Sequence, residues 1–344
     1  MLKAQNIVAL ACALTVYGGV ARSAQLTALG SDAVLIANGQ KLFTHVWSVN
    51  EGLGPQINAR SCVGCHAVPS VGGSGGSDDR AFVTISPLIL DPSGGHVFRR
   101  LRVSIKGAVT EQASPAISAL RRAPSLFGSG ALESLSHADI ISSVPTSIVL
   151  GRVPEGRFGW KGRLKNLDEA VAAAFANELG LSSLMFPETA KDGRVPSPPE
   201  VSTRQIAAVA AYIRALPPMR GEPLSDSGRG RELFQHAGCT GCHRPTFPTL
   251  EARRMFPYTD LLLHDMGPAL ADWMQEGVAT GTEFKTPSLW GLARTGPPYL
   301  HDGRAKTLQD AILAHAGEAH ESAIAYQRLT PAEQATVLAF LRSL

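Results

Sequence analysis

The sequence carries the same five-residue pattern twice, Cys-x-x-Cys-His, at Cys62–His66 and at Cys239–His243. In each copy the two cysteines lie about one helical turn apart, and a histidine follows the second directly. This spacing is typical of c-type haem attachment, in which two thiols bind one porphyrin and the histidine ligates its iron. The two motifs therefore predict two covalently bound haems, held by Cys62, Cys65, His66, Cys239, Cys242 and His243.

Zinc sites and redox dithiols also use paired cysteines. A zinc site built from two such pairs usually separates them by about 15–20 residues, whereas here most of the chain lies between them. A thioredoxin-like dithiol does not need the histidine that follows. The fifth cysteine, Cys12, lies in a segment that we expect to be removed, so haem attachment would use every remaining thiol.

Residues 1–24 have the pattern of a secretory signal peptide, with Lys3 at the start, an apolar core and small residues at a cleavage site. The apolar core is shorter than the about 20 residues of a membrane span. We expect a protein exported to the periplasm, soluble and without a membrane span once the signal is removed. Cys12 gives a poor lipobox, which disfavours a lipoprotein. A formal charge of +3 on 344 residues gives no sign of nucleic-acid binding.

Four segments recur in the same order in both halves of the chain. Residues 39–45, 123–128, 160–171 and 203–216 match residues 230–236, 286–291, 301–312 and 330–344. Such a repeat indicates two copies of one structural unit. We predict a mainly α fold of two tandem cytochrome c-like domains, residues 25–220 and 221–344, with long loops. A few short strands are expected in the first domain, within residues 83–109, because β-branched residues cluster there.

The third repeated segment differs between the halves at one position that matters for haem chemistry. His315 aligns with Ala174, and His301 aligns with Trp160. If this helix crosses the haem, the C-terminal iron gains a second ligand and the N-terminal iron stays open. A six-coordinate haem suits electron transfer, and an open one can bind peroxide or oxygen. We predict His315 as the second ligand of the C-terminal haem; the competing candidates are Met266 and His264.

Residues 258–267, 286–291, 300–305 and 315–319, with 51–55, 58–62 and 156–161, resemble the di-haem oxidoreductase family, often labelled "predicted thiol oxidoreductase". That family is similar to bacterial di-haem cytochrome c peroxidases and to MauG-type enzymes, which oxidise residues of a partner protein. The resemblance implies a peroxidatic N-terminal haem and an electron-transfer C-terminal haem. It also implies peroxide or another small oxidant as substrate, with electrons from a periplasmic donor or a protein substrate.

The resemblance places a carboxylic acid near the open iron to move protons, and Glu178 and Glu133 are the two candidates. General acid–base catalysis of this kind contributes typically ~10²–10⁴-fold. His315 stands where the peroxidases carry Met and the MauG-type enzymes Tyr. Paired histidine ligation generally gives a lower reduction potential than His/Met ligation.

The resemblance further implies a calcium ion between the domains, for which Asn58, Thr295 and Pro297 could supply the oxygen ligands that calcium prefers. Arg163 and Arg304 recur in both halves, so we predict that they pair with haem propionates through bidentate hydrogen bonds. The tryptophans considered as electron relays between the haems are Trp160 and Trp290.

Together these observations predict a periplasmic di-haem c-type oxidoreductase, peroxidase-like, that reduces peroxide at an open N-terminal haem. Electrons would pass through the six-coordinate C-terminal haem. The alternative from another class is a non-enzymatic di-haem electron-transfer cytochrome, in which His96 or His137 closes the N-terminal haem. A third hypothesis is a haem protein that handles iron or senses redox state.

Overall fold

The structure is a computed structural model that describes residues 32–75, 82–86, 96–98, 101–104, 106–111, 119–142, 151–187, 198–221 and 228–344. The predicted signal peptide, residues 1–24, lies outside these ranges. Within the described ranges, no helix has the length and apolar character needed to cross a membrane.

Helices dominate the described chain, as predicted. Residues 32–44 form the first helix. The later α-helices are α2 (Ser129–Glu133), α3 (His137–Ser142), α4 (Leu167–Ala174), α5 (Thr203–Ala215), α6 (Gly228–His236), α7 (Pro248–Glu251), α8 (Leu292–Thr295), α9 (Leu308–Leu313), α10 (His320–Gln327) and α11 (Pro331–Ser343). Short turns of other helix types are η1 (Val49–Glu51), η2 (Cys62–Gly64), η4 (Phe175–Leu179), η5 (Cys239–Gly241) and η6 (Gly317–Ala319).

The helices of the repeat begin at side chains that the sequence marks as caps. Asn166 accepts a hydrogen bond from the Glu169 N–H at the start of α4, at 2.8 Å. Thr307 does the same for Asp310 in α9, at 3.0 Å. Each cap satisfies a backbone donor that has no partner inside its helix. α5 and α11 begin with complete capping boxes.

In each half the helix before the Cys-x-x-Cys-His motif crosses the last helix of that half at a glycine. A Cβ atom added to Gly39 would lie 1.9 Å from the Ala208 carbonyl oxygen in α5. One added to Gly230 would lie 2.5 Å from the Cβ of Phe340 in α11. Glycine is needed at both crossings because no side chain fits between the two backbones.

The two halves also repeat their aromatic packing. The rings of Phe43 and Tyr212 lie 5.4 Å apart at 57°, and those of Phe234 and Phe340 lie 5.5 Å apart at 58°. Each pair belongs to a separate buried apolar cluster, one formed within residues 43–213 and one within residues 233–341. The two halves therefore share the packing of these aromatic pairs as well as the sequence pattern.

The described strands are short, and all pairing is antiparallel. They are β1 (Gln56–Ile57), β2 (Phe82–Ser86), β3 (His96–Phe98), β4 (Leu101–Val103), β5 (Val109–Glu111), β6 (Ala119–Arg122), β7 (Leu263–Asp265) and β8 (Glu283–Lys285). They form sheets of order β1-β4-β5, β3-β2-β6 and β7-β8. The strands predicted within residues 83–109 are confirmed, whereas the β7-β8 pair in the second half was not predicted.

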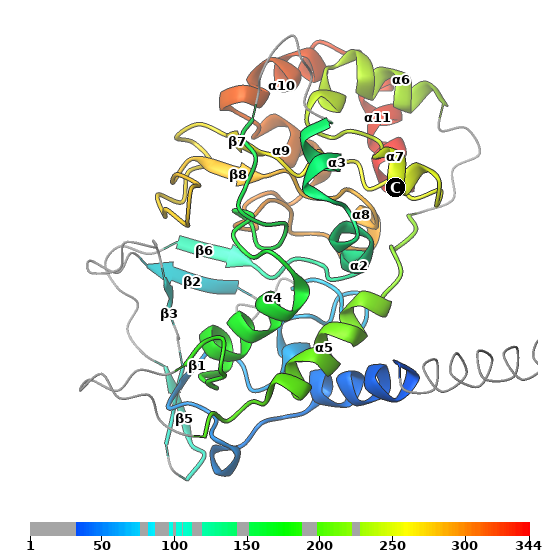
Figure 1. The fold of residues 1–344 in the computed structure, drawn as a ribbon. Coiled ribbons are helices and arrows are strands. Elements are labelled where there is room, and N and C mark those ends of the chain that lie inside the picture. Colours follow the sequence, from blue (N-terminus) through cyan, green and yellow to red (C-terminus); the bar gives the residue numbers. More distant parts are fainter. Residues whose placement is uncertain are drawn as a thin grey trace, which may run out of the picture.

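Figure 1 shows α6, α9, α10 and α11 at one end of the molecule and α4, α5 and β1 at the other. A third apolar cluster joins the halves, because Leu132, Leu135 and Ile140 from α2 and its neighbourhood pack with later residues. Those later residues are Phe247, Leu250, Leu261, Leu262 and Trp290. α2 and α3 therefore pack against the C-terminal half, although they belong to the first half of the sequence.

Candidate functional site

Both Cys-x-x-Cys-His motifs fold into the same tight turn. The His66 N–H donates to the Cys62 carbonyl at 3.0 Å, and the His243 N–H donates to the Cys239 carbonyl at 2.9 Å. None of the four cysteines forms a disulfide. Burial raises the pKa of both Cys62 and Cys239 to about 12. Reactive redox dithiols instead need a lowered pKa, so these thiols do not resemble a thioredoxin-like site.

The two motifs do not combine into one zinc site. Among the described residues, the group of metal-binding side chains that lies close together is Cys242, Asp260 and His264. It includes neither cysteine of the first motif. A closed zinc site would need four ligands around one point, so the geometry disfavours the zinc alternative.

Three histidines are held with the same ring orientation by backbone carbonyls. The Nδ1–H of His66 donates to Gly73 O at 3.1 Å, and that of His243 donates to Tyr258 O at 3.0 Å. His315 donates in the same way to Ala311 O at 2.7 Å. A carbonyl at Nδ1 leaves Nε2 as the unprotonated, metal-binding nitrogen. Burial lowers the pKa of His66 and His315 and brings that of His243 to about 4, which keeps these rings neutral.

A phenylalanine ring packs near each motif histidine in a tilted arrangement. Phe43 lies 6.3 Å from the His66 ring at 54°, and Phe234 lies 6.4 Å from the His243 ring at 53°. The same phenylalanines pack on the last helices of their halves. The crossing helices therefore position the histidines through these two rings.

All three histidines line one continuous cavity of about 520 Å³. Cys62, Cys239 and Cys242 line it as well, and most of the other lining side chains are apolar. A buried apolar cavity with thiols and neutral imidazoles at its wall fits a porphyrin that binds through both cysteines and histidine. The donor set and the lining therefore fit the haem that the motifs predict.

The halves differ on the side of the cavity that faces the motif histidine. In the C-terminal half the His315 and His243 rings lie 6.5 Å apart between centroids. That separation leaves room for one metal atom between the two imidazoles. In the N-terminal half Ala170, Val171 and Ala174 of α4 line the cavity, and no side chain among them can ligate a metal.

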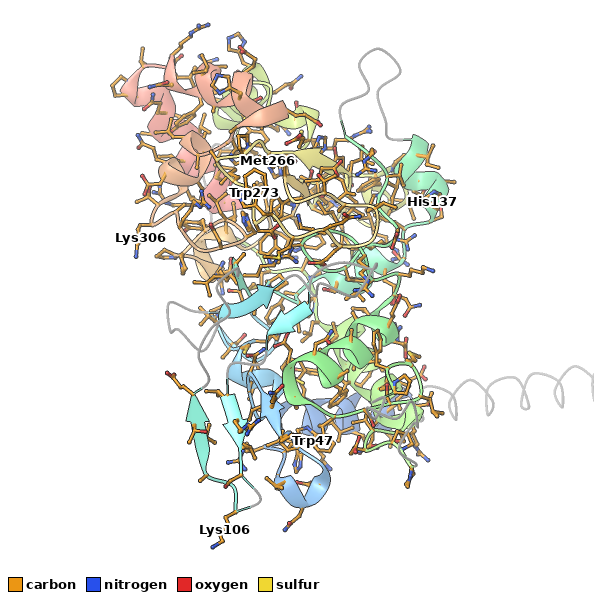
Figure 2. All side chains as sticks on the ribbon, turned by 90° about the vertical axis from the view of Figure 1, so that its left-hand side faces the viewer. Trp47, Lys106, His137, Met266, Trp273 and Lys306 are labelled. Atoms are coloured by element: carbon orange, nitrogen blue, oxygen red, sulfur yellow. The ribbon has the colours of Figure 1, made fainter. Side chains whose placement is uncertain are left out.

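The two residues that compete with His315 in the sequence prediction, His264 and Met266, have different surroundings. Both ring nitrogens of His264 are bound to carboxylates, Nε2 to Asp260 at 2.9 Å and Nδ1 to Glu318 at 2.7 Å. Burial alone would lower the pKa of His264, but the hydrogen bonds to Asp260 and Cys242 raise it to about 11. A protonated ring has no lone pair for a metal. Met266 lines the cavity and is labelled in Figure 2 within the C-terminal half.

Neither candidate acid is among the described residues that line the cavity. Glu178 lies in the η4 turn directly after α4, and its carboxylate accepts a hydrogen bond from Asn58 Nδ2 at 2.9 Å. Glu133 caps the Leu167 N–H at 2.7 Å and forms an ion pair with Arg214. Both carboxylates therefore have partners outside the described cavity wall.

Two of the three residues predicted to hold calcium, Asn58 and Thr295, are already engaged in other contacts. The Asn58 side chain is bound to Glu178. The Thr295 carbonyl accepts hydrogen bonds from Ser74 Oγ at 3.0 Å and from the guanidinium of Arg122. Pro297 follows in a segment with two cis prolyl bonds. A buried guanidinium therefore supplies positive charge at one of the predicted calcium ligands.

The other predicted haem contacts divide into two groups. Trp160 and Trp290 line the cavity, and Trp290 is 7% exposed. Arg163 and Arg304 are not among its described lining residues, and Arg304 is half-exposed and bound to Asp302 at 2.6 Å. The cations that do line the cavity are Arg122, Arg157 and Lys285.

Sequence reasoning missed Arg122 and Lys285, although a signal for them exists. Each directly precedes the repeated segment at residues 123–128 or 286–291, so the two occupy the same position in the repeat. His301 is the residue that aligns with Trp160 in the repeat. Its side chain is buried, with its ring stacked on Phe284 at 4.0 Å.

Three solved structures resemble the chain at low sequence identity. Hydrazine synthase of Kuenenia stuttgartiensis is 16% identical, with a TM-score of 0.47, covering 90% of this chain and 87% of that one. The diheme peroxidase BthA from Burkholderia thailandensis is 16% identical, with a TM-score of 0.47 and coverage of 90% and 86%. A MauG-like protein associated with microbial copper homeostasis is 19% identical, with a TM-score of 0.41 and coverage of 90% and 88%.

No curated protein matches the chain. Residues 139–344 match the family described as "Di-haem oxidoreductase, putative peroxidase". This match contains the second Cys-x-x-Cys-His motif, His315 and α4, and it spans more than half of the sequence. The chain therefore belongs to the di-haem oxidoreductase family, whose cofactor is haem.

Proposed function

We propose that the chain is a periplasmic di-haem c-type oxidoreductase that reduces peroxide at its N-terminal haem. Cys62 and Cys65 would attach one haem and Cys239 and Cys242 the other, with His66 and His243 as iron ligands. The haem-bearing parts would be two cytochrome c-like domains, residues 25–220 and 221–344, exported by the signal at residues 1–24. Electrons would come from a periplasmic donor or a protein substrate.

One observation carries the proposal. His315 faces His243 at 6.5 Å between ring centroids, whereas the equivalent position in the N-terminal half is Ala174, on the cavity wall. This difference supports one site that would hold a metal from both sides and another that would hold it from one side only. A closed site would suit electron transfer and an open one the binding of peroxide, because the axial ligands and the distal pocket decide what a haem does.

The side chains around the proposed open site have distinct tasks. When bound, the haem supplies an iron that can bind peroxide and accept electrons. Gly73 O fixes the His66 ring through Nδ1. The apolar side chains of α4 keep bulk water out, because they offer no hydrogen-bond partner. Trp160 and Trp290 are the proposed relays between the two sites.

Of the two acids, we propose Glu178 for proton movement. Glu133 is committed to Arg214 and to the Leu167 N–H, so a proton transfer from it would disrupt an ion pair. Glu178 accepts a hydrogen bond from Asn58 and follows the helix that lines the site. Glu178 does not line the cavity, so the proposed proton transfer would pass through water between them.

A non-enzymatic electron-transfer cytochrome remains the alternative function. It would require a second ligand at the N-terminal haem. His137 is exposed on α3, away from the cavity-lining residues, and Figure 2 shows it at the outer edge of the molecule. The His96 side chain lies outside the described residues.

Electron paramagnetic resonance of the oxidised protein, measured beside a His315→Ala variant, tests the proposal. Mass spectrometry is used first, to test whether two haems are covalently bound. We expect one high-spin and one low-spin ferric signal, with the low-spin signal lost in the variant. Two low-spin signals in the unmodified protein would favour the electron carrier. A low-spin signal that survives in His315→Ala would assign the second ligand to Met266 instead.

A further inference from the structure

Arg122 and Lys285 occupy equivalent positions in the two halves, at the ends of β6 and β8. Their backbones make equivalent contacts across the halves. The Arg122 N–H donates to the His301 carbonyl at 2.7 Å, and the Lys285 N–H donates to the Trp160 carbonyl at 2.8 Å. His301 and Trp160 are themselves equivalent in the repeat. The two halves thus exchange the same contact, and each exchange brings one cation to the cavity wall.

Both cations are deeply buried. Arg122 is 8% exposed and Lys285 is 9% exposed, and both line the cavity. Burial lowers the pKa of Arg122 to about 10 and that of Lys285 to about 8. Removing a cation from water is unfavourable unless an anion compensates it.

Neither cation forms an ion pair among the described residues. Arg122 donates to the Gly75 carbonyl at 2.8 Å, to Ser74 Oγ at 2.8 Å and to the Thr295 carbonyl. Lys285 makes one long hydrogen bond, 3.5 Å, to the Thr286 carbonyl. The charge of Asp260 raises the pKa of Lys285, but the Asp260 carboxylate is bound to His264.

Two other buried cations, beside this cavity but not on its wall, show the ordinary arrangement. Lys161 lies 3.2 Å from the Asp272 carboxylate, and Arg121 pairs with Asp272 and Glu276. Lys161 and Arg121 are therefore buried together with carboxylates of the same chain. Arg122 and Lys285 have no carboxylate of this kind among the described residues, so a carboxylate of the molecule that fills the cavity can pair with each of them.

We propose that Arg122 and Lys285 bind the propionate carboxylates of the two haems, one cation for each haem. The proposal rests on the proposed covalent attachment of haem to both motifs. It replaces Arg163 and Arg304, which do not line the cavity, as the propionate partners. The repeat supplies the reason for one cation per haem, since each half contributes one basic residue at the same position.

The test measures the reduction potential of each haem in the full-length, haem-loaded protein, with Lys285→Met and Arg122→Met. A cation near a haem disfavours the ferric form, which carries one more positive charge than the ferrous form. Its removal should shift the equilibrium toward ferric haem about tenfold, which corresponds to about 59 mV for one electron. We expect each variant to lower the potential of a different haem, and Lys285→Arg to restore it.

Lys161→Met is the matched control, because it removes the charge of another buried lysine, one whose amino group lies 3.2 Å from the carboxylate that it shares with Arg121, Asp272. It should leave both potentials within a small fraction of the shift caused by Lys285→Met. Lys285→Gln is measured in parallel, since it keeps a polar group but removes the charge and should shift the potential in the same direction. Unchanged potentials, or shifts of one and the same haem in both variants, would overturn the proposal. Absence of covalent haem by mass spectrometry would instead contradict the proposed function.

Discussion

α4 in the N-terminal half and α9 in the C-terminal half begin alike and end differently. Both start at a capped residue and bury a leucine at the first helical position, Leu167 or Leu308. α4 then continues into the η4 turn, which buries Phe175 in the core. α9 stops at Leu313, and His315 follows two residues later with its ring against Ala311 O.

The difference shows how a helix end can create a metal ligand. The last carbonyls of a helix have no N–H partner within it. At the end of α9 one of them, Ala311 O, accepts the Nδ1–H of His315, whose ring lies 6.5 Å from that of His243. In the N-terminal half the helix continues past Ala174, so no equivalent support for a histidine arises there. Among the described residues, the same repeat unit thereby gives the facing pair His243 and His315 in one half and leaves Ala174 at the position equivalent to His315 in the other.

Ala174→His would break this difference most strongly. If Ala174 faces the open side of the N-terminal haem, the new imidazole should compete with peroxide for the iron. We expect peroxide turnover to fall roughly 100-fold or more, since substrate must then displace a bound ligand. Steady-state peroxidase assays and the loss of the high-spin signal would check this. Ala174→Leu, which fills the space without ligating, should leave the spin state unchanged.

Glu178→Gln separates the two candidate acids. We expect about a 100-fold loss of peroxide turnover, the size typical of a lost general acid–base, with the fold intact. Glu133→Gln should instead weaken the contact with Arg214, at a cost of about 1 kcal/mol of stability for this partly exposed pair. Rates from stopped-flow mixing and unfolding curves in denaturant give both values. Equal activity losses in the two variants would contradict the assignment of Glu178.

Gly39→Ala and Gly230→Ala compare the two helix crossings. Each added methyl group would meet the facing helix, at 1.9 Å from the Ala208 carbonyl oxygen or 2.5 Å from the Phe340 Cβ. Overpacking of this kind typically costs about 1–3 kcal/mol. We expect both variants to lower the free energy of unfolding, Gly39→Ala more, because a backbone carbonyl yields less than a side chain. A neutral effect at either site would show that the helices can separate.

His301 adds a pH dependence to the contact between the halves, where its equivalent Trp160 does not titrate. Burial lowers the pKa of His301 to about 4, below the 6.5 of an exposed histidine. The folded protein therefore binds fewer protons than the unfolded chain, so this contribution is present above pH 6.5 and is lost as the pH falls toward 4. Between pH 7 and 5 we expect a loss of about 1–2 kcal/mol. Denaturant unfolding at both pH values should show a smaller loss in His301→Gln.

The sequence was a good guide wherever the repeat could be compared with itself. The capped starts of α4, α5, α9 and α11 follow from local side-chain chemistry, and so do the turns at both motifs. Alignment of the halves also singled out His315 against Ala174. It could not separate His315 from His264, because the carboxylates that bind both nitrogens of His264 come from Asp260 and from the distant Glu318.

The sequence by itself determined the prediction of haem as cofactor, because the attachment motif consists of five neighbouring residues and occurs twice. The tertiary structure decided which charged groups reach the cavity. Arg163 and Arg304 recur as plainly as Arg122 and Lys285, yet only the latter two line the cavity. The physical reason is that backbone contacts between the halves, at the ends of β6 and β8, hold Arg122 and Lys285 at the cavity wall. Whether a basic side chain is buried, and whether a carboxylate lies beside it, depends on how the chain packs.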